Sequence, residues 1–319
     1  MQEHSTQTPA STSRAVRLES FGGPEVLNLH EVPAPQAGAG QIRVRVTAAG
    51  LNPMDWFMTS DAETAARFGL SLPAGFGTDY AGVVDQVGDG VTGFAVGDRV
   101  YGGALSRAVA DFVIVEAAGT IAVGGDAHHT PDGIDDRTAA TLAIAGCTAA
   151  AALAVVNPGP VDTVLIGGAA GGVGVFAVQL ASLAGARVIG TGSTTSSDFL
   201  RGLGAEPVAY GDGLADRVRR LAPGGVTAAI DLYGAETAHA ARELGVADAR
   251  ITTIAAQVDG ITPANGANAA PGALEEIARL VAAHKLRVPI AASFPAEQIR
   301  AAVELQAGRH VHGKVVIDL

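Results

Sequence analysis

The chain has 319 residues, of which 48% are hydrophobic and 17% charged, so it can fill two domains with sizeable cores and is not disordered overall. Its formal net charge of -11 argues against a nucleic-acid groove or an anionic membrane surface as partner. A single cysteine, Cys147, excludes an intrachain disulfide framework and fits a reducing cytoplasm.

The first third of the chain has the pattern of short strands. Residues 1–13 are polar and lack an apolar stretch, so we expect a flexible tail rather than a signal peptide. The predicted strands are Ala15 to Leu18, Leu27 to Val32, Ile42 to Ala48, Tyr80 to Val87, Arg99 to Tyr101 and Phe112 to Val115. Short strands punctuated by glycine turns predict a β-barrel or sandwich-like unit. The polar stretch Asp126 to Asp136 is expected to link this unit to a second domain.

Helices alternate with strands after this loop. The run Ala139 to Val156 is mostly alanine, which predicts a buried helix rather than a membrane span. Predicted strands are Val164 to Ile166, Val188 to Gly190, Pro207 to Tyr210, Ala228 to Leu232, Arg250 to Ile254 and the closing Lys314 to Leu319. Predicted helices are Val175 to Leu183, Asp198 to Leu203, Leu214 to Leu221, Thr237 to Leu244 and Leu274 to Ala283. The alternation predicts βαβ units around a parallel sheet.

A glycine-rich turn joins the strand at Val164 to the helix that follows it. Gly168, Gly171 and Gly174 form a G-x-x-G-x-x-G pattern instead of the strict G-x-G-x-x-G. Glycines let the backbone turn tightly and approach a pyrophosphate, whose charge then lies at the positive N-terminus of the helix. The strand–turn–helix context therefore predicts a dinucleotide site, and the alternative is a glycine-rich turn without a ligand.

The end of the next strand bears on the choice between NADH and NADPH. A carboxylate there would accept a hydrogen bond from the ribose 2′-OH of NAD and repel a 2′-phosphate. Here no carboxylate occurs between Gly190 and Ser197, and Ser193 to Ser197 are all hydroxyl residues. The sequence therefore favours NADPH, with Arg201 as the next basic residue, although such a stretch can also be a plain polar loop.

Six stretches carry a resemblance to a known family. They are AGLNPMDW (49–56), LPAGFGTDYAGVVDQVGDGVTGFAVGDRVYG (72–102), AGCTAAAAL (145–153), VLIGGAAGGVG (164–174), DFLRGLGAE (198–206) and HGKVVIDL (312–319). Together they resemble the medium-chain dehydrogenase/reductase superfamily, and within it the zinc-free quinone oxidoreductase and enoyl reductase branch. The resemblance implies an α/β fold. A GroES-like β-barrel domain over 14–136 would be completed by 286–319, and a doubly wound Rossmann domain would span 137–285.

The same resemblance implies where the cofactor and substrate bind, in the cleft between the domains. It places Asn52 beside the nicotinamide ribose, Thr148 near the nicotinamide, Gly171, Gly172 and Val173 at the pyrophosphate, Tyr210 against the adenosine 2′-phosphate, and Leu232, Tyr233 and Ala255 along the cofactor's path. Ser193 and Arg201 join the expected cofactor residues because of the loop itself, where relatives often have a lysine or arginine and this chain has none before Arg201. Asn52, Trp56 and Tyr80 would face the substrate. Structural alternatives are a turn role for Asn52 before Pro53 and a hydroxyl-to-backbone bond for Thr148.

Zinc-dependent relatives hold their ion with cysteine and histidine ligands. Where they carry the first cysteine this chain has Gly50-Leu51-Asn52, and where they carry Gly-His-Glu it has Gly77-Thr78-Asp79. Their four-cysteine lobe is missing from the sequence. The histidines His128, His129, His310 and His312 have no cysteine or carboxylate at ligand spacing and are expected at the surface. The prediction is a protein without zinc.

Hydride addition to a quinone, or to the activated C=C bond of an enone or enoyl thioester, needs no metal to polarise a carbonyl. We therefore expect this reaction on a small-molecule substrate. Tyr80, Tyr101 and Asp55 are candidate proton donors, but none has a partner visible in the sequence, so no catalytic residue is assigned and water can supply the proton. A non-redox cyclase or isomerase and an NADP-binding sensor remain open on the same fold.

The segment Gln257 to Gly272 departs from the family. Relatives usually carry a further strand here, which often pairs with a second subunit. The sequence QVDGITPANGANAAPG lacks an alternating apolar run and is rich in residues that disfavour strands, so we expect a poor edge strand. A homodimer, if one forms, is then expected to use another surface.

Overall fold

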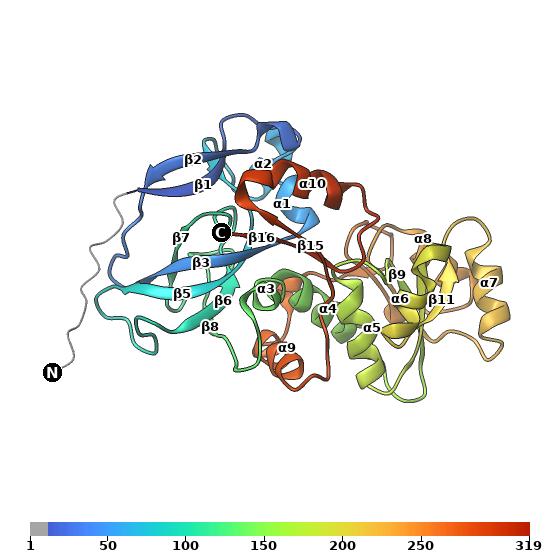
Figure 1. Cartoon of the computed structure of the whole chain (residues 1–319). Coiled ribbons are helices and arrows are strands. Elements are labelled where there is room, and N and C mark those ends of the chain that lie inside the picture. Colours follow the sequence, from blue (N-terminus) through green and yellow to red (C-terminus); the bar gives the residue numbers. More distant parts are fainter. Residues whose placement is uncertain (1–11) are drawn as a thin grey trace.

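The N-terminal part of the chain folds into two β-sheets (Figure 1). The structure is a computed structural model that describes residues 12–319. The smaller sheet contains β2 (Asn28–Pro33), β1 (Thr12–Leu18) and β4 (Ala74–Gly75). The larger sheet contains β3 (Gln41–Leu51), β5 (Asp79–Val87), β6 (Arg99–Gly103), β7 (Phe112–Glu116) and β8 (His128–His129). Two short helices, α1 (Pro53–Phe57) and α2 (Ala62–Arg67), follow β3.

The C-terminal segment returns to the larger sheet, as the family resemblance implied. It contains β15 (Ile290–Pro295), α10 (Ile299–Ala307) and β16 (Lys314–Asp318). β16 runs antiparallel to β3, with Val315 opposite Leu51, and the strand order is β15-β16-β3-β5-β6-β8, with β7 also paired to β3. This recorded pairing is an open path, so closure into a complete barrel stays an expectation. The sequence did not predict β15 or α10.

The central part of the chain forms a six-stranded parallel sheet, which confirms the Rossmann-like fold class. Its order is β11 (Glu206–Ala209), β10 (Arg187–Gly192), β9 (Thr163–Gly167), β12 (Ala228–Asp231), β13 (Ile251–Thr253) and β14 (Thr262–Pro263). Its helices are α4 (Ala143–Val156), α5 (Gly174–Leu183), α6 (Ser197–Gly202), α7 (Leu214–Leu221), α8 (Glu236–Glu243) and α9 (Ala273–Ala282). The order of strands reverses between β9 and β12, which is where such sheets bind their ligands.

Side chains of one strand bury themselves on both faces of this sheet. Val164 and Ile166 of β9 belong to the cluster that includes α4 and α5, whereas Leu165 belongs to the cluster that includes α7 and α8. The continuous apolar run at Val164 therefore marks a strand covered by helices on both sides.

One close approach brings the domains together. α3 (Asp136–Ala139) and α4 lie between the larger sheet of the first domain and the six-stranded parallel sheet (Figure 1). A Cβ on Gly50 would overlap the carbonyl oxygen of Ala140, so glycine at the end of β3 lets this connection pass directly against the strand. The predicted alanine helix begins at Ala143 rather than Ala139, because α3 forms a separate turn before it.

One expectation needs correction. Thr12 and Ser13, assigned to the tail, already belong to β1, where Ser13 pairs with Val32; the rest of the expected tail lies outside the described residues.

The segment 257–272, expected to make a poor edge strand, contributes only the two-residue β14. Thr262 of β14 pairs with Thr252 of β13, and the Thr252 hydroxyl donates to the Thr262 oxygen at 2.8 Å.

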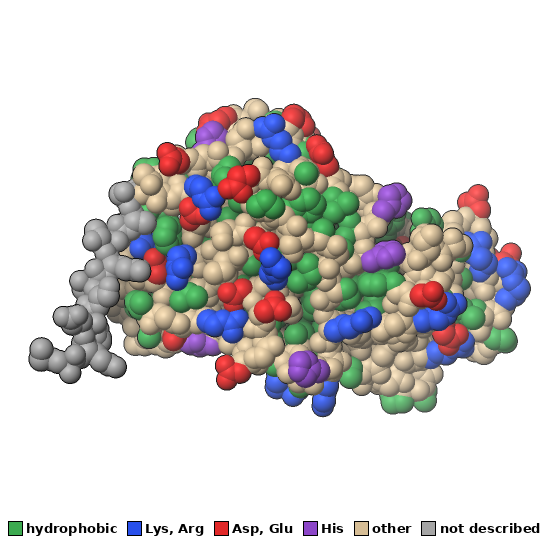
Figure 2. Space-filling view, in the orientation of Figure 1, with side chains coloured by type: hydrophobic (Ala, Val, Ile, Leu, Met, Phe, Trp, Pro, Cys, Tyr) green, Lys and Arg blue, Asp and Glu red, His purple; other side chains and the backbone are tan. Residues whose placement is uncertain are grey.

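Charged side chains are spread over the face of the molecule that Figure 2 shows. On the face seen in Figure 2, acidic and basic side chains are interspersed, and no broad basic patch is visible among the described residues. Within residues 12–319, no helix is both long enough and apolar enough to cross a membrane.

Candidate active site

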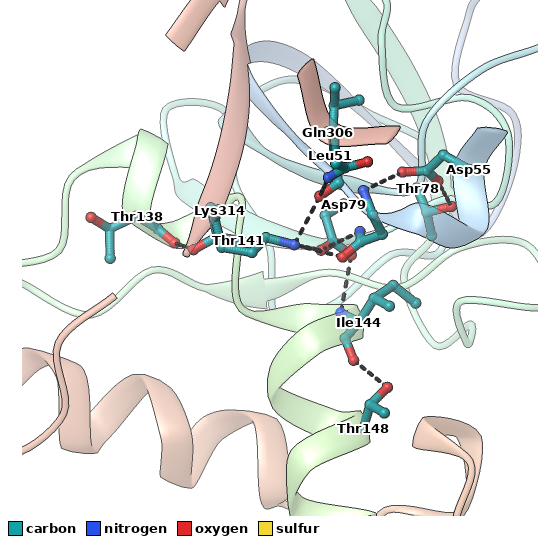
Figure 3. A network of polar contacts seen from close by, with 11 residues as sticks. Leu51, Asp55, Thr78, Asp79, Thr138, Thr141, Ile144, Thr148, Gln306 and Lys314 are labelled. Carbon is teal, nitrogen blue, oxygen red and sulfur yellow. Dashed lines mark hydrogen bonds and ion pairs between the residues drawn. The ribbon is translucent and has the colours of Figure 1, made fainter. Parts of the chain in front are cut away.

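A buried polar network lies at the junction of the two domains (Figure 3). Its members are Asn52, Asp55, Thr78, Asp79 and Lys314, each no more than 3% exposed. The first four come from the ends of β3 and β5 and from α1, whereas Lys314 opens β16 at the other end of the chain. Buried polar groups must satisfy one another, so this cluster is an organised unit of the fold.

Asn52 is held at both ends of its side chain. Its amide nitrogen donates to Asp79 Oδ2 at 2.9 Å, and its amide oxygen accepts from Lys314 Nζ at 2.5 Å. An ammonium can only donate, so the oxygen of the amide must face Lys314 and the nitrogen must face the carboxylate. The orientation of the Asn52 side chain is thereby fixed by two charged neighbours.

Asp79 links the first domain to the start of α4. Its carboxylate accepts from the backbone N–H of Ile144 at 3.1 Å and lies 3.8 Å from Lys314 Nζ. Burial raises the pKa of Asp79 to about 6, although Lys314 and the hydrogen bond from Asn52 pull it down. Burial also lowers the pKa of Lys314, against the opposing pull of Asp79 and Asp55.

Asp55 contacts the backbone of Asn52. Its carboxylate accepts from the backbone N–H of Asn52 at 2.8 Å and from the Thr78 hydroxyl at 2.7 Å. Burial raises the pKa of Asp55 to about 7, and these two hydrogen bonds only partly offset the shift. Asn52 and Thr78 stand where zinc-dependent relatives were expected to have ligands, and here their side chains are engaged with carboxylates.

The glycine turn after β9 fits a phosphate group. Gly168 has a φ of +67°, which favours glycine, and a Cβ on Gly174 would overlap the backbone of Ala169. A Cβ on Gly171 would make one tight contact, with the Gly168 oxygen at 3.3 Å, and would meet no other neighbour in the described chain within 4 Å. Within residues 12–319 the backbone N–H groups of Gly172 and Val173 have no acceptor. Orphan donors at the start of α5 are what an anion binds.

The C-terminal segment that returns to the larger sheet contacts both this turn and the polar network. Gly313 donates from its backbone N–H to the Ala170 oxygen at 2.9 Å. The side chain of Lys314 then runs past the turn, so that its Cδ would lie 3.2 Å from a Cβ on Gly172. Gly313 and Lys314, at the start of β16, therefore touch both the expected pyrophosphate site and the residue expected at the nicotinamide ribose.

Other expected cofactor residues lie around the same crevice. Leu232 and Tyr233 follow β12, and the Tyr233 Cβ would lie 3.3 Å from a Cβ on Gly168. Arg309 lies against the rings of both Tyr233 and Trp56. Its guanidinium carbon is 5.0 Å from the centroid of the Tyr233 ring and 6.0 Å from the centroid of the Trp56 ring. Ala255 is exposed just beyond β13.

Thr148 makes the hydroxyl-to-backbone hydrogen bond that was the structural alternative to a cofactor contact. Its hydroxyl donates to the Ile144 oxygen at 2.6 Å, one turn earlier in α4 (Figure 3). The same hydroxyl would lie 2.8 Å from a Cβ on Gly266, so Thr148 also packs against the segment after β14. Contact with a nicotinamide stays a prediction.

The loop after β10, residues 193–197, consists of serine and threonine and is called the hydroxyl loop; its side chains hydrogen-bond to one another. Ser193 Oγ lies 2.8 Å from Thr195 Oγ1 and 2.7 Å from Ser196 Oγ. Tyr210 lies beside the loop, since its backbone N–H donates to the Gly192 oxygen at 3.4 Å. Arg201 forms an ion pair with Asp198 on its own helix, at 2.8 Å.

The three candidate proton donors are all engaged elsewhere. Tyr80 is 0% exposed and its hydroxyl donates to the Asp126 oxygen at 2.7 Å, which argues against the expected substrate contact. Tyr101 is buried, with its hydroxyl 3.5 Å from the Leu274 oxygen. Burial raises the pKa of both phenols. Asp55 is enclosed in the polar network, so none of the three is free to reach a substrate.

Two histidines expected at the surface are half-buried. His128 Nδ1 lies 3.0 Å from Glu275 Oε1, and its Nε2 lies 3.5 Å from Asp126 Oδ2. Burial lowers the pKa of His128, but the two carboxylates outweigh it and raise the pKa overall. His312 stacks on Phe199. The sequence could not show these contacts because the partners on other elements are more than a hundred residues away.

The described chain shows little that could bind a metal. Within residues 12–319, no group of three or more His, Cys, Asp or Glu side chains is arranged to hold an ion. Burial raises the pKa of the Cys147 thiol to about 12, so it stays protonated at neutral pH.

Sequence reasoning missed the partners of Asn52. Asp79 and Lys314 were read only as parts of motifs, and Gln306, which donates to the Leu51 oxygen at 2.8 Å, was not noticed. A signal was present for Lys314, because it comes directly before the apolar run VVI in the closing strand KVVIDL.

Known protein families match two parts of the chain. Residues 38–125 match the family described as alcohol dehydrogenase GroES-like domain, and residues 203–317 match the family described as zinc-binding dehydrogenase. Quinone oxidoreductase of Rattus norvegicus is 37% identical over 185 residues, which cover 56% of this chain and 52% of that protein. The match thus spans about half the length of this curated relative, and similar shares hold for the others like it.

Solved structures match nearly the whole chain. The quinone oxidoreductase from Coxiella burnetii has a TM-score of 0.82 at 28% identity, covering 97% of this chain and 99% of that one. The CurK enoyl reductase has a TM-score of 0.84 at 25% identity, covering 96% and 99%. A mycobacterial protein complexed with NADPH has a TM-score of 0.83 at 26% identity, covering 96% and 100%.

Proposed function

Because this chain belongs to the medium-chain dehydrogenase/reductase superfamily, we propose that it is an NADPH-dependent oxidoreductase. Its reaction is hydride transfer to a quinone or to the activated C=C bond of an enone or enoyl thioester, without zinc. Quinone oxidoreductases and an enoyl reductase among the similar proteins support this substrate class. A similar structure that contains NADPH supports the cofactor.

One observation carries the proposal. Gly313 of the C-terminal segment contacts the glycine turn, where the N–H groups of Gly172 and Val173 have no acceptor within residues 12–319. Its neighbour Lys314 fixes the amide of Asn52. A dinucleotide would bind here with its pyrophosphate at the turn and its nicotinamide ribose at Asn52. The glycine turn alone would be equally compatible with a βα connection that binds nothing.

The chain's own residues would bind and orient, while bound NADPH supplies the hydride. The N–H groups of Gly172 and Val173 would bind phosphate oxygens at the start of α5. The Asn52 amide, fixed by Lys314 and Asp79, would hold the ribose in one orientation. Precise placement of two reactants supplies much of the rate enhancement of such a transfer. The Tyr80 and Tyr101 hydroxyls face the protein interior, so water is the proposed source of the proton.

Independence from zinc is supported by the donor set at the junction. Thiolate and imidazole would be needed, whereas Asn52 and Thr78 offer an amide and a hydroxyl that are already hydrogen-bonded to Asp79 and Asp55. The match to the zinc-binding dehydrogenase family covers 203–317, which contains neither residue.

The test is loss of absorbance of NADPH at 340 nm with a panel of quinones, enones and enoyl thioesters. We expect turnover with at least one class, and none in a Gly171→Asp variant that remains folded. Tight NADPH binding without turnover on any member would favour the sensor alternative, and conversion of a substrate with no change in NADPH would favour a cyclase or isomerase.

A further inference from the structure

His312 lies against the hydroxyl loop although it belongs to the far end of the chain. Its Nε2 is 2.9 Å from the Ser196 hydroxyl oxygen, and its ring stacks on Phe199 with centroids 4.9 Å apart and an interplanar angle of 23°. Ser196 is 3% exposed and also contacts Ser193, so the imidazole joins an existing chain of hydroxyl groups. The stacking and the hydrogen bond together fix the orientation of the ring.

The hydroxyl loop lacks a free cation of its own. Ser193 follows directly after β10, the second strand of the nucleotide-binding unit, where the adenosine ribose of a dinucleotide lies. Arg201 is the first basic residue along the chain, and it is paired with Asp198 on the same helix. A 2′-phosphate carries nearly two negative charges, so hydroxyl donors alone would leave most of its charge uncompensated.

We propose that His312 is the specificity-determining residue of the 2′-phosphate subsite, which the C-terminal segment and the loop 193–196 build together. This inference rests on the proposed use of NADPH. The imidazole donates to the phosphate and carries positive charge when protonated, and the half-buried Ser193 hydroxyl adds a second donor, while the buried Ser196 hydroxyl holds the imidazole in place. The chain thus replaces a basic residue in the loop by one that folding brings from 116 positions away.

The placement of His312 also ties the 2′-phosphate to the junction of the domains. Gly313 and Lys314, the next two residues, contact the glycine turn and Asn52. The three consecutive residues His312 to Lys314 therefore reach the adenosine end, the pyrophosphate turn and the nicotinamide end of the expected cofactor path. A ligand without the 2′-phosphate would leave the contact to His312 unused.

Two fragments that differ only in the 2′-phosphate test the assignment on the full chain. We would measure binding of 2′,5′-ADP and 5′-AMP by calorimetry for the wild type and for His312→Gln, which keeps a polar side chain but cannot become charged. We expect the wild type to prefer 2′,5′-ADP. His312→Gln should weaken 2′,5′-ADP about tenfold, as for loss of one charge-assisted hydrogen bond, and leave 5′-AMP unchanged.

Two further variants sharpen the result. His312→Arg should retain the preference for 2′,5′-ADP, because a guanidinium also pairs with phosphate. His310→Gln is the matched control, since it is an exposed histidine on the same segment, and it should change neither affinity. Melting temperatures show whether each variant is folded. If His312→Gln does not fold, the His312→Arg result decides: loss of the preference in the folded arginine variant overturns the assignment.

Failure of the assignment differs from failure of the proposed function. If the wild type prefers 2′,5′-ADP but His312→Gln keeps the full preference, or weakens both fragments equally, the role of His312 is wrong and NADPH use stands. If the wild type shows no preference for 2′,5′-ADP and binds NADH as tightly as NADPH, the NADPH proposal fails, and the subsite assigned to His312 falls with it.

Discussion

The ammonium nitrogen of Lys314 lies 2.5 Å from the side-chain oxygen of Asn52, which comes 262 residues earlier in the chain. Both side chains are almost completely buried, and Lys314 also donates to the Leu51 oxygen at 3.1 Å. A buried ammonium is costly unless its donors and its charge are satisfied. The last strand of the protein therefore completes a polar network that the first domain begins.

Replacing this lysine should destabilise the protein strongly. Lys314→Met keeps the length of the side chain but leaves the Asp79 carboxylate without its cation, which typically costs about 3–5 kcal/mol for a buried pair. The free energy of unfolding from urea titrations measures the loss. In the double variant with Asp79→Asn we expect less loss than the sum of the two single variants. Strict additivity would show that the two side chains are not coupled.

The buried carboxyl of Asp55 should make stability depend on pH. Its pKa is raised to about 7, above the value of about 3.9 for an unfolded chain, so the native state holds the proton more tightly. Stability from this group is therefore greatest at low pH and is lost as pH rises from about 4 to about 7, at up to about 1.4 kcal/mol per pH unit.

Asp55→Asn mimics the protonated carboxyl and provides the comparison. The difference in unfolding free energy between wild type and variant should move in favour of the variant as pH rises through this window, and stay constant above about pH 8. A constant difference between wild type and Asp55→Asn from pH 4 to 8 would contradict the raised pKa.

Substitutions in the glycine turn should separate folding from binding. A Cβ on Gly171 would meet a single backbone oxygen at 3.3 Å, which a shift of a few tenths of an ångström relieves, so Gly171→Asp should fold, while its carboxylate repels a phosphate at the start of α5. We expect NADPH affinity, followed by fluorescence titration, to fall by at least about tenfold. Gly174→Ala is the contrast, because its Cβ would overlap the backbone of Ala169 and should lower the melting temperature instead. Unchanged affinity in folded Gly171→Asp would mean that the phosphates bind elsewhere.

Activity should not depend on zinc. Asn52 and Thr78 supply no thiolate or imidazole where relatives were expected to bind the ion. After exhaustive treatment with a chelator we expect at least about nine tenths of the activity to remain, and elemental analysis to find well under one zinc per chain. Stoichiometric zinc that is lost together with activity would refute the prediction.

The sequence alone determined the features that depend on local pattern. The β-branched run at Val164, the glycines after it and the apolar spacing of the next helix lie within one contiguous stretch, so periodicity and turn chemistry suffice to predict them. The helix over 214–221 was predicted with the bounds that the structure has, because its apolar residues face one side. The absence of a carboxylate after β10 could likewise be read directly.

Tertiary structure alone decided which distant residues meet. Lys314 at Asn52, His312 at Ser196 and Asp79 at the start of α4 are contacts across more than 60 residues, and no local pattern encodes them. The contacts of Lys314 and His312 arise because β16 pairs with β3 and carries the segment before it across the glycine turn. The same holds for β14, whose two residues pair only because β13 already offers an open edge. The local sequence pattern therefore predicted the glycine turn, whereas only the pairing of β16 with β3 brings Lys314 beside it.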